Sequence, residues 1–438
     1  MTVSLVKFDD SLDSLRKAVE LCDGFEKLNS TGKILIKPNN CFRHRLLPPY
    51  GMVTTSKIID GVIQLLLEYG CKDISIGEGA ITGILNELEP YTKRGFKGTG
   101  IDKVAEKYGV KLIDFNQGPF QEVALGGIKA QVAQAALETD FLINIPVLKT
   151  HLQTKVSLGF KNLKGCLNKA SRQKFHTTNR LDSLISLLNE SIKSDLVIID
   201  GIYMLEKGPE TYAGVAYRKN LFIASTDIFE CDTIGATILG IDPSQVNYLR
   251  EFAERNNRSF DIGAIQMQGE DLESLKEQLE WQIEPDKVLL SQSRVTGLSS
   301  PHPGQTVCSA CGLTLALAVS LLAKDNPEMD FGGAELFCGL EVRPERDTCN
   351  AILYGNCAIK HNKSLQNAIK IEGCPPSLTT TLLALMKALL SKPRMLRMTL
   401  VRAMKLVGIR IGVYDEAFPG WERYHSIEFD KTHFTLVD

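Results

Sequence analysis

The sequence has almost no net charge and no long apolar run, and each shortage excludes a class of protein. Its 438 residues carry 50 Lys and Arg against 52 Asp and Glu, which gives a net charge of −2. No overall field draws such a chain toward nucleic acid or an anionic membrane. The longest mostly apolar runs, near Leu313–Ala323 and Leu382–Leu390, are too short to span a bilayer. We therefore expect neither nucleic acid nor a membrane span.

Signals for targeting and for nucleotide binding are also missing. The N-terminus has no basic segment followed by an apolar one, so it does not resemble a signal peptide. We therefore expect a cytoplasmic protein, whose thiols stay reduced. The chain has neither the GxGxxG fingerprint nor the GxxxxGK[ST] loop that cradles nucleotide phosphates. With 44% hydrophobic residues it is still apolar enough to build cores, which excludes a disordered protein.

Cysteine is present but unevenly distributed. Six of the 11 cysteines lie within the 67 residues from Cys308 to Cys374, and five are spread over the other 371 residues. In a reducing compartment such a cluster indicates metal binding or redox chemistry, and not a disulfide framework. The scattered ones are expected to be small buried hydrophobes: Cys22, Cys41, Cys71, Cys166 and Cys231.

Four cysteines of the cluster have the surroundings of metal ligands. Cys308 and Cys311 form a CxxC pair at the start of an expected helix, where amide N–H groups favour thiolates. Cys357 and Cys374 each follow an expected strand and a glycine that permits close backbone approach. Loops at the carboxyl ends of parallel strands converge, so these four thiolates can meet.

The spacing favours an iron–sulfur cluster over zinc. Zinc sites usually pair two CxxC knuckles, whereas this chain has one CxxC and two isolated cysteines. We therefore expect a [4Fe–4S] cluster on Cys308, Cys311, Cys357 and Cys374, with zinc or no metal as the alternatives. Cys338 is a reserve ligand, and Cys349 has no assigned role.

Residues 1–295 have the pattern of an α/β domain with a mostly parallel, doubly wound sheet. Short runs rich in Ile, Val and Leu alternate with amphipathic stretches. The expected strands are Lys33–Lys37, Ile74–Gly77, Phe141–Ile145, Leu196–Asp200 and Leu221–Ser225. The expected helices include Ser56–Tyr69, Ile101–Tyr108, Leu181–Ser191 and Leu272–Glu280.

A turn-rich segment near residue 300 begins a different pattern. Residues 296–390 predict a second, smaller α/β domain that carries the cysteines. Its expected elements are a helix at Leu313–Lys324 and strands at Ala334–Phe337, Ala351–Tyr354 and Ala368–Glu372. Residues 391–438 predict a basic helix and a C-terminal tail, because residues 391–410 carry six basic residues and no acidic one. That helix is either solvated and packed on the body or a partner contact.

A basic segment with two histidines follows one expected strand. The stretch from Lys149 to Arg180 contains eight Lys or Arg, two His and no acidic residue. Ligand sites of open α/β sheets lie beyond the carboxyl ends of strands, and several other strand ends here carry polar groups. We therefore expect a crevice that binds a small anion such as a carboxylate or phosphate. A solvated charged face is the alternative.

The candidate residues divide by expected role. His151 and His176 are the candidate acid and base, because the charge of histidine is adjustable near neutral pH. Lys161 is grouped with them as a catalytic candidate that also anchors the anion. The substrate-binding candidates are Lys37, Asn39, Glu78, Lys149, Lys164 and Asp200.

The order of these motifs resembles a known family. Segments ILIKPNN (34–40), ISIGEGA (74–80), INIPVLKTH (143–151), GFKNLKGCLN (159–168) and VIIDG (197–201) are similar to the family called domain of unknown function 362, over about residues 30–290. Members of that family are commonly linked to iron–sulfur clusters, so the resemblance implies such a cluster here. The CxxC, GNC and GCPP motifs look like the companion iron–sulfur region of some members. The ferredoxin run C-x₂-C-x₂-C-x₃-C-P is absent.

A more distant similarity runs to the lactate racemase (nickel-pincer) family. In that family, His and Lys residues of the corresponding region hold a nickel-pincer nucleotide and act as acid and base. The resemblance carries these roles to His151, Lys161 and His176 only. The cysteine-rich region has no counterpart there.

Together these patterns predict an iron–sulfur oxidoreductase that acts on a small anionic substrate or cofactor in the basic crevice. Two alternatives stay open. One is a lactate-racemase-like isomerase with a structural cluster, and the other is a non-catalytic electron-transfer or cluster scaffold protein. A redox partner protein and a homodimer are the expected macromolecular contacts.

Overall fold

The computed structural model divides the chain into two compact units. It describes residues 1–40, 49–80, 91–209, 211, 214–283, 295–300, 306–345, 347, 350–395, 398 and 421–434. The described residues of 1–80, 91–282 and 427–434 form unit 1, and those of 283–426 form unit 2. The chain therefore enters unit 2 from unit 1 and returns to unit 1 at its C-terminal end.

Unit 1 is built on a mixed sheet of ten described strands, in the order β12-β1-β11-β10-β7-β2-β3-β4, with β8 paired to β10 and β9 paired to β8. The strands are β1 (Thr2–Lys7), β2 (Lys33–Pro38), β3 (Asp73–Glu78), β4 (Lys111–Asp114), β7 (Phe141–Ile145), β8 (Val147–His151), β9 (Lys155–Val156), β10 (Leu196–Glu206), β11 (Val215–Ser225) and β12 (Gln266–Gly269). A separate hairpin joins β5 (Phe120–Leu125) to β6 (Ile128–Ala133).

Most strand pairs in the sheet are parallel, so the predicted fold class is confirmed. Strands β10, β7, β2, β3 and β4 pair in parallel in that order. Strand β11 instead runs antiparallel to both β10 and β1. An apolar run such as Leu221–Ser225 predicts a buried strand but not its direction.

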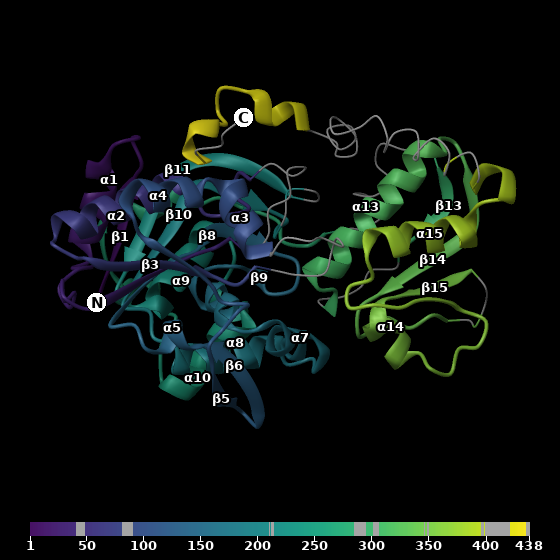
Figure 1. Ribbon diagram of the computed structural model, residues 1–438, viewed down its shortest axis with the longest axis horizontal. Helices are drawn as coiled ribbons and strands as arrows, with labels where there is room; N and C mark the ends of the chain where they lie inside the picture. Colours follow the sequence, from purple (N-terminus) through teal and green to yellow (C-terminus); the bar gives the residue numbers. More distant parts are fainter. Residues whose placement is uncertain are drawn as a thin grey trace. The chain divides into compact units, whose positions relative to one another are not determined.

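Helices cover both faces of this sheet. Figure 1 shows α1, α2 and α4 on one side and α8, α9 and α10 on the other. The helices of unit 1 are α1 (Leu12–Leu21), α2 (Ser56–Glu68), α3 (Tyr91–Thr99), α4 (Ile101–Tyr108), α5 (Gln134–Leu137), α6 (Gly159–Asn162), α7 (Lys169–Thr177), α8 (Leu181–Ser191), α9 (Ile228–Ile238), α10 (Asn247–Asn256) and α11 (Leu272–Leu275).

One expected helix is too long. The prediction for Leu272–Glu280 is wrong beyond α11, which ends at Leu275. The residues after α11 turn their backbone toward α9 instead: the N–H of Glu277 donates to the Ile238 carbonyl at 2.8 Å, and that of Leu279 donates to the Leu239 carbonyl at 3.1 Å.

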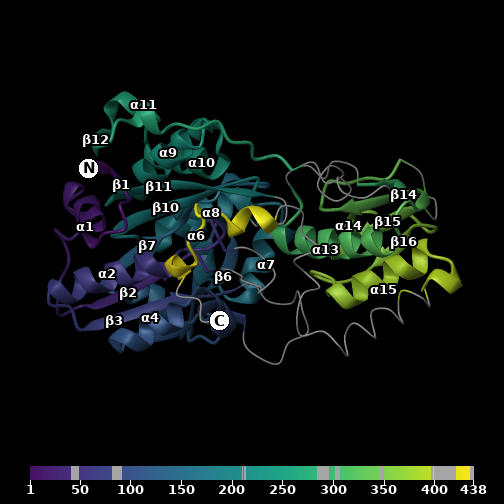
Figure 2. The same cartoon turned by 90° about the horizontal axis from the view of Figure 1, so that it is seen from above.

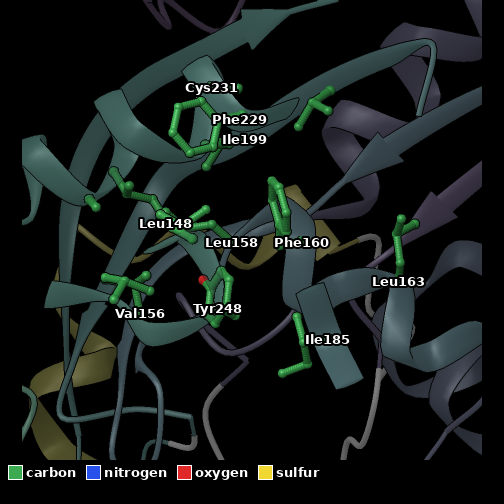
Figure 3. Close-up of a cluster of buried hydrophobic side chains, with 14 of the residues drawn as sticks. Leu148, Val156, Leu158, Phe160, Leu163, Ile185, Ile199, Phe229, Cys231 and Tyr248 are labelled. Atoms are coloured by element: carbon green, nitrogen blue, oxygen red, sulfur yellow. The ribbon is translucent and has the colours of Figure 1, made fainter. Parts of the chain in front are cut away.

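The core between the sheet and the second helical layer anchors the basic segment. Figure 3 shows Phe160 among Ile185, Phe229 and Tyr248, and Leu163 belongs to the same buried cluster. Phe160 stacks on Tyr248 with ring centroids 5.8 Å apart. Such burial contributes roughly 1.5–3 kcal/mol per large apolar side chain, so this part of the segment is held firmly.

Unit 2 has a four-stranded parallel sheet in the order β13-β14-β15-β16. Its described elements are β13 (Thr296–Ser299), α13 (Ser309–Asp325), β14 (Asp330–Cys338), β15 (Ala351–Tyr354), α14 (Gly355–His361), β16 (Ile369–Ile371) and α15 (Leu378–Leu389). Helices α13 and α15 pack on each other (Figures 1 and 2). The strands and the helix expected in this region coincide with described elements.

The C-terminal segment returns to unit 1 and packs there. His433 in η6 (Lys431–Phe434) lies 3.1 Å from the Asp10 carboxylate and 2.9 Å from the Tyr203 hydroxyl. The described residues 427–434 therefore belong to unit 1, and the expected separate tail does not include them. Most of the expected basic helix at 391–410 lies outside the described residues.

Candidate functional site

The carboxyl ends of β2 and β3 hold a buried ion pair. The Lys37 ammonium lies 2.9 Å from the Glu78 carboxylate, and the two side chains are 0% and 1% exposed. Glu78 also accepts hydrogen bonds of 2.7 Å from the backbone N–H groups of Asn40 and Gly79. Lys37 donates to the carbonyl of Pro38 at 2.7 Å. The pair therefore shapes the backbone at both strand ends.

Gly165 presses its backbone against this ion pair. A Cβ atom at Gly165 would lie 2.4 Å from Glu78 Oε1 and 2.8 Å from Lys37 Nζ. The site tolerates only glycine there, because any side chain would displace a buried charge. This contact explains the glycine in the motif Lys-Asn-Leu-x-Gly.

We expect Gly165→Ala to destabilise unit 1 by at least about 1–3 kcal/mol, the usual cost of overpacking a core. Urea unfolding followed by circular dichroism measures the change. Gly263→Ala is the matched control, because its Cβ would meet nothing closer than the Asp261 carboxylate at 3.3 Å. Equal stability of the two variants would contradict the close approach.

Strand β8 contributes Lys149 and His151. Both are 1% exposed, although they are polar. Lys149 Nζ donates to the carbonyl of Met52 at 2.6 Å and lies 3.5 Å from Asn39 Oδ1. His151 Nδ1 accepts the backbone N–H of Gln153 at 3.0 Å. Since Nδ1 accepts, the neutral ring carries its proton on Nε2.

The segment GFKNLKG that follows is folded into α6 and the 3₁₀ turn η1 (Leu163–Cys166). Phe160 and Leu163 point into the core and are 0% exposed, whereas Lys161 and Lys164 are only partly buried. Asn162 donates to the carbonyl of Lys37 at 3.2 Å. Phe160 and Leu163, three residues apart, are thus buried in the core, whereas Lys161 and Lys164 stay partly exposed.

Asp232 in α9 fixes the start of α6, and sequence reasoning missed it. Its carboxylate accepts the N–H groups of Gly159 at 2.7 Å and Phe160 at 2.9 Å. Burial raises the pKa of Asp232 to about 7, although these bonds oppose the shift. No local motif marks this residue, because its partners lie about 70 positions earlier in the chain.

Helix α7 brings His176 to the same region. Lys164 Nζ and His176 Nε2 lie 2.5 Å apart. One turn earlier on α7, the Arg172 guanidinium donates to the carbonyls of Gly79 and Ala80, which follow β3. Arg172 therefore fastens the helix that carries His176 to the end of a central strand.

The described part of this site is electropositive. Burial lowers the pKa of His151 well below its ordinary value, and the charges of Lys161, Lys149 and Lys164 lower it further. Burial, Lys164 and Lys161 likewise lower the pKa of His176. The histidines and lysines named from the sequence therefore act on one another. Both rings are neutral at pH 7.

These shifts predict a pH dependence of stability. Below about pH 6.5 the unfolded chain binds protons at His151 that the folded chain does not, so stability falls as the pH falls. We expect His151→Asn, which keeps an acceptor for the Gln153 N–H, to lose less melting temperature than the wild type between about pH 7 and about pH 5. Exposed His361→Asn is the control. An unchanged pH dependence in His151→Asn would contradict the shift.

Two other candidates have structural contacts. Asp200 is 1% exposed and accepts the N–H and hydroxyl of Thr55, at 2.7 and 2.9 Å, at the start of α2. Burial raises its pKa to about 6. Asn39 donates its N–H to Thr54 Oγ1 at 2.8 Å. Both position the chain before α2, and the segments after β2 and β3 lie outside the described residues, so the crevice stays a prediction.

In unit 2, five cysteines lie at the carboxyl edge of the parallel sheet. Cys308 is the N-cap residue of α13, and Cys311 lies in its first turn. Cys338 is the last residue of β14. Cys357 lies in the first turn of α14, directly after β15, and Cys374 follows β16.

The sulfur atoms of this edge interact. Cys311 has side-chain hydrogen bonds with Cys308 and Cys338, and the charge of Cys374 acts on it. Burial raises the pKa of Cys357 to about 11, and the charges of Cys308 and Cys374 add to the shift.

Two glycines bring the loops of this edge together. A Cβ on Gly355, whose φ is +83°, would lie 3.4 Å from the Cys311 sulfur. The Asn356 N–H donates to the Gly373 carbonyl at 2.9 Å, and the Gly373 N–H donates to Asn356 Oδ1 at 2.8 Å. The loops that carry Cys357 and Cys374 are thus joined.

The donor set fits an iron–sulfur cluster in its chemistry. Cys311 and Cys338 are buried, and Cys308, Cys357 and Cys374 are partly buried. Thiolates gathered at such a place repel one another, and a bound metal centre removes that penalty. Within the described ranges, no three His, Cys, Asp or Glu side chains are already arranged as metal ligands. The assignment therefore rests on the convergence of the thiols.

Four of the five scattered cysteines, Cys22, Cys71, Cys166 and Cys231, are buried, as small hydrophobes are expected to be. Cys41 and Cys349 lie outside the described residues. Among the helices that the structure describes, none is long and apolar enough to cross a membrane. The cytoplasmic location stays a prediction.

The chain is similar in sequence to a protein of Synechocystis sp. and to a family model. The chain is 27% identical over 242 residues to the "Thylakoid-associated protein sll1697" of Synechocystis sp., an alignment that covers 54% of this chain and 72% of that protein. A solved structure, the lactate racemase apoprotein from Thermoanaerobacterium thermosaccharolyticum, aligns with this chain at a TM-score of 0.37 and 12% identity. The alignment covers 89% of this chain and 81% of that one. The family model described as "Domain of unknown function (DUF362)" matches residues 34–237, so the resemblance to that family is confirmed for this part of the chain.

Proposed function

We propose that this chain is a [4Fe–4S] protein that performs oxidoreductase chemistry on a small anionic substrate or cofactor. The observation that carries the proposal is the gathering of five cysteines at one sheet edge of unit 2. Cys308, Cys311, Cys357 and Cys374 are the proposed ligands, because each lies in a loop or a first helical turn. Cys338 ends a paired strand and stays the reserve ligand.

A cluster held there supplies one-electron transfer, or Lewis acidity at an open iron. The protein contributes the surroundings. Cys308 and Cys311 lie at the start of a 17-residue helix, whose free N–H groups favour negative charge. Gly355 keeps the space beside the Cys311 sulfur open, because a Cβ there would lie 3.4 Å away.

The anion is proposed to bind in unit 1 beside Lys149, Lys161 and Lys164. The lowered pKa values of His151 and His176 support this, because they result in part from the charges of these lysines. Lys37 and Glu78 neutralise each other, so they shape the site and do not add to its charge. A neutral histidine pair beside lysines binds an oxyanion and moves protons at it.

A second candidate function is an isomerase or racemase that works on the histidine and lysine residues alone. The histidine pair with depressed pKa values favours it, since acid–base chemistry at a bound carboxylate needs no electron transfer. In that case the metal at the cysteines is structural. A third, a non-catalytic carrier, needs only unit 2.

Metal analysis tests the first proposal. Protein purified without oxygen is expected to be brown and to contain about four iron and four sulfide per chain. Colourless, iron-free protein after anaerobic reconstitution would contradict it. Once a turnover assay exists, Cys357→Ser and His151→Ala separate the alternatives. An oxidoreductase needs both residues, an isomerase needs only His151, and a carrier needs only Cys357.

A further inference from the structure

The contact between Lys164 and His176 fixes which nitrogen of the imidazole carries the proton. Lys164 Nζ lies 2.5 Å from His176 Nε2. An ammonium group has donors only, so Nε2 must accept. A neutral imidazole has one N–H, and in His176 that N–H is therefore on Nδ1.

The Nδ1 atom of His176 is buried and has no hydrogen-bond partner among the described residues. A buried donor without an acceptor is destabilising, because it has lost its hydrogen bonds to water and gained none in the protein. The acceptor for this N–H therefore lies outside the described residues. This N–H points to a ligand oxygen.

His151 carries its proton on the other ring nitrogen. Its Nδ1 accepts the N–H of Gln153, so its proton is on Nε2. Both rings therefore offer an N–H donor and keep their basic nitrogen occupied. In this state each ring serves as a hydrogen-bond donor and as an acid through its N–H.

We propose that Lys164 and His176 form a proton relay that protonates an oxyanion-bearing small molecule bound at the His176 Nδ1–H. The proton on Nδ1 passes to the ligand, and Nε2 takes a proton from the Lys164 ammonium. The imidazole ends neutral as the other tautomer, Lys164 ends as a neutral amine, and water reprotonates it. The ligand gains the one proton that Lys164 loses, and no electrons move.

The surroundings of His176 suit this role. Burial and the charges of Lys164 from η1 and Lys161 from α6 lower the pKa of His176 and so favour the neutral ring. His151 from β8 is close enough for the two rings to influence each other. Arg172, one turn earlier on α7, bonds to the carbonyls of Gly79 and Ala80 and positions the helix. This inference rests on the proposed anion site, and it does not depend on the cluster.

Histidine tautomers are read directly by long-range ¹H–¹⁵N NMR of the full chain labelled with ¹⁵N-histidine. We expect His176 to show the Nδ1–H form and His151 the Nε2–H form at neutral pH. Lys164→Met should move His176 to the Nε2–H form and raise its pKa, whereas Lys164→Gln keeps a donor and should retain the Nδ1–H form. Lys174→Met, on the exposed side of α7, is the control.

A His176 that shows the Nε2–H form in the wild type, or that keeps the Nδ1–H form in Lys164→Met, would overturn the relay. Titration with acetate and with inorganic phosphate tests the ligand. A shift of the His176 Nδ1 proton with either anion supports the oxyanion and shows which kind is preferred, and no shift with both would overturn it. Iron content is measured on the same samples, so failure of the relay and failure of the cluster are told apart.

Discussion

Cys311→Ala is expected to lower the iron content of anaerobically purified protein from about four atoms per chain to fewer than about one, with loss of the brown colour. Cys311 interacts with the three cysteines Cys308, Cys338 and Cys374. Removing its sulfur leaves three of the four proposed ligands. Iron and sulfide assays together with the visible spectrum measure the effect.

Two control variants sharpen this prediction. Cys71→Ala removes a buried thiol of unit 1 and should keep about four iron. Cys338→Ala should also keep them, because Cys338 is the reserve ligand. Loss of iron in Cys338→Ala with full retention in Cys357→Ala would contradict the proposed ligand set. Full retention in Cys311→Ala would contradict a cluster at this edge.

Glu78→Leu is expected to destabilise unit 1 by about 3–5 kcal/mol, because it leaves the Lys37 ammonium buried without its counter-charge. Lys37 is 0% exposed, so no water replaces the lost carboxylate. The variant also leaves the N–H groups of Asn40 and Gly79 without their acceptor. Urea unfolding at neutral pH, followed by circular dichroism, measures the loss.

Glu106→Leu is the matched control. Glu106 pairs with Lys103 at 3.2 Å on the exposed face of α4, where an ion pair contributes roughly 0–1 kcal/mol. The loss in free energy of unfolding should therefore be several-fold larger for Glu78→Leu than for Glu106→Leu. A small loss in Glu78→Leu, similar to that in Glu106→Leu, would show that the buried pair does not hold the ends of β2 and β3 together.

The apolar runs of the sequence located most central strands, because burial on both faces requires nearly continuous Ile, Val and Leu. The strands β2, β3 and β7 lie where those runs lie. Strand direction could not be predicted, because the apolar run Leu221–Ser225 of β11 resembles the runs of the parallel strands, yet β11 runs antiparallel to both β10 and β1. The β5–β6 hairpin had a usable signal that was not recognised, the pair Gly126-Gly127 between Leu125 and Ile128.

The residues of the candidate site were also only partly predictable from the sequence. Lysines and histidines in one segment gave a visible charge pattern, and the structure places Lys149, His151, Lys161, Lys164 and His176 within electrostatic reach of one another. Asp232 shows no such pattern in the sequence, because it lies in a mostly apolar helix and meets its partners only after folding. The return of His433 to Asp10, more than 400 residues away, also depends on tertiary packing alone.

The central claim is that the cysteine edge of unit 2 holds an iron–sulfur cluster. Low-temperature EPR of the anaerobically purified, dithionite-reduced chain tests it most directly. The account predicts a signal of a reduced [4Fe–4S] centre that integrates to about one spin per chain and vanishes in Cys311→Ala. An EPR-silent sample that contains about one zinc per chain instead of iron would contradict it.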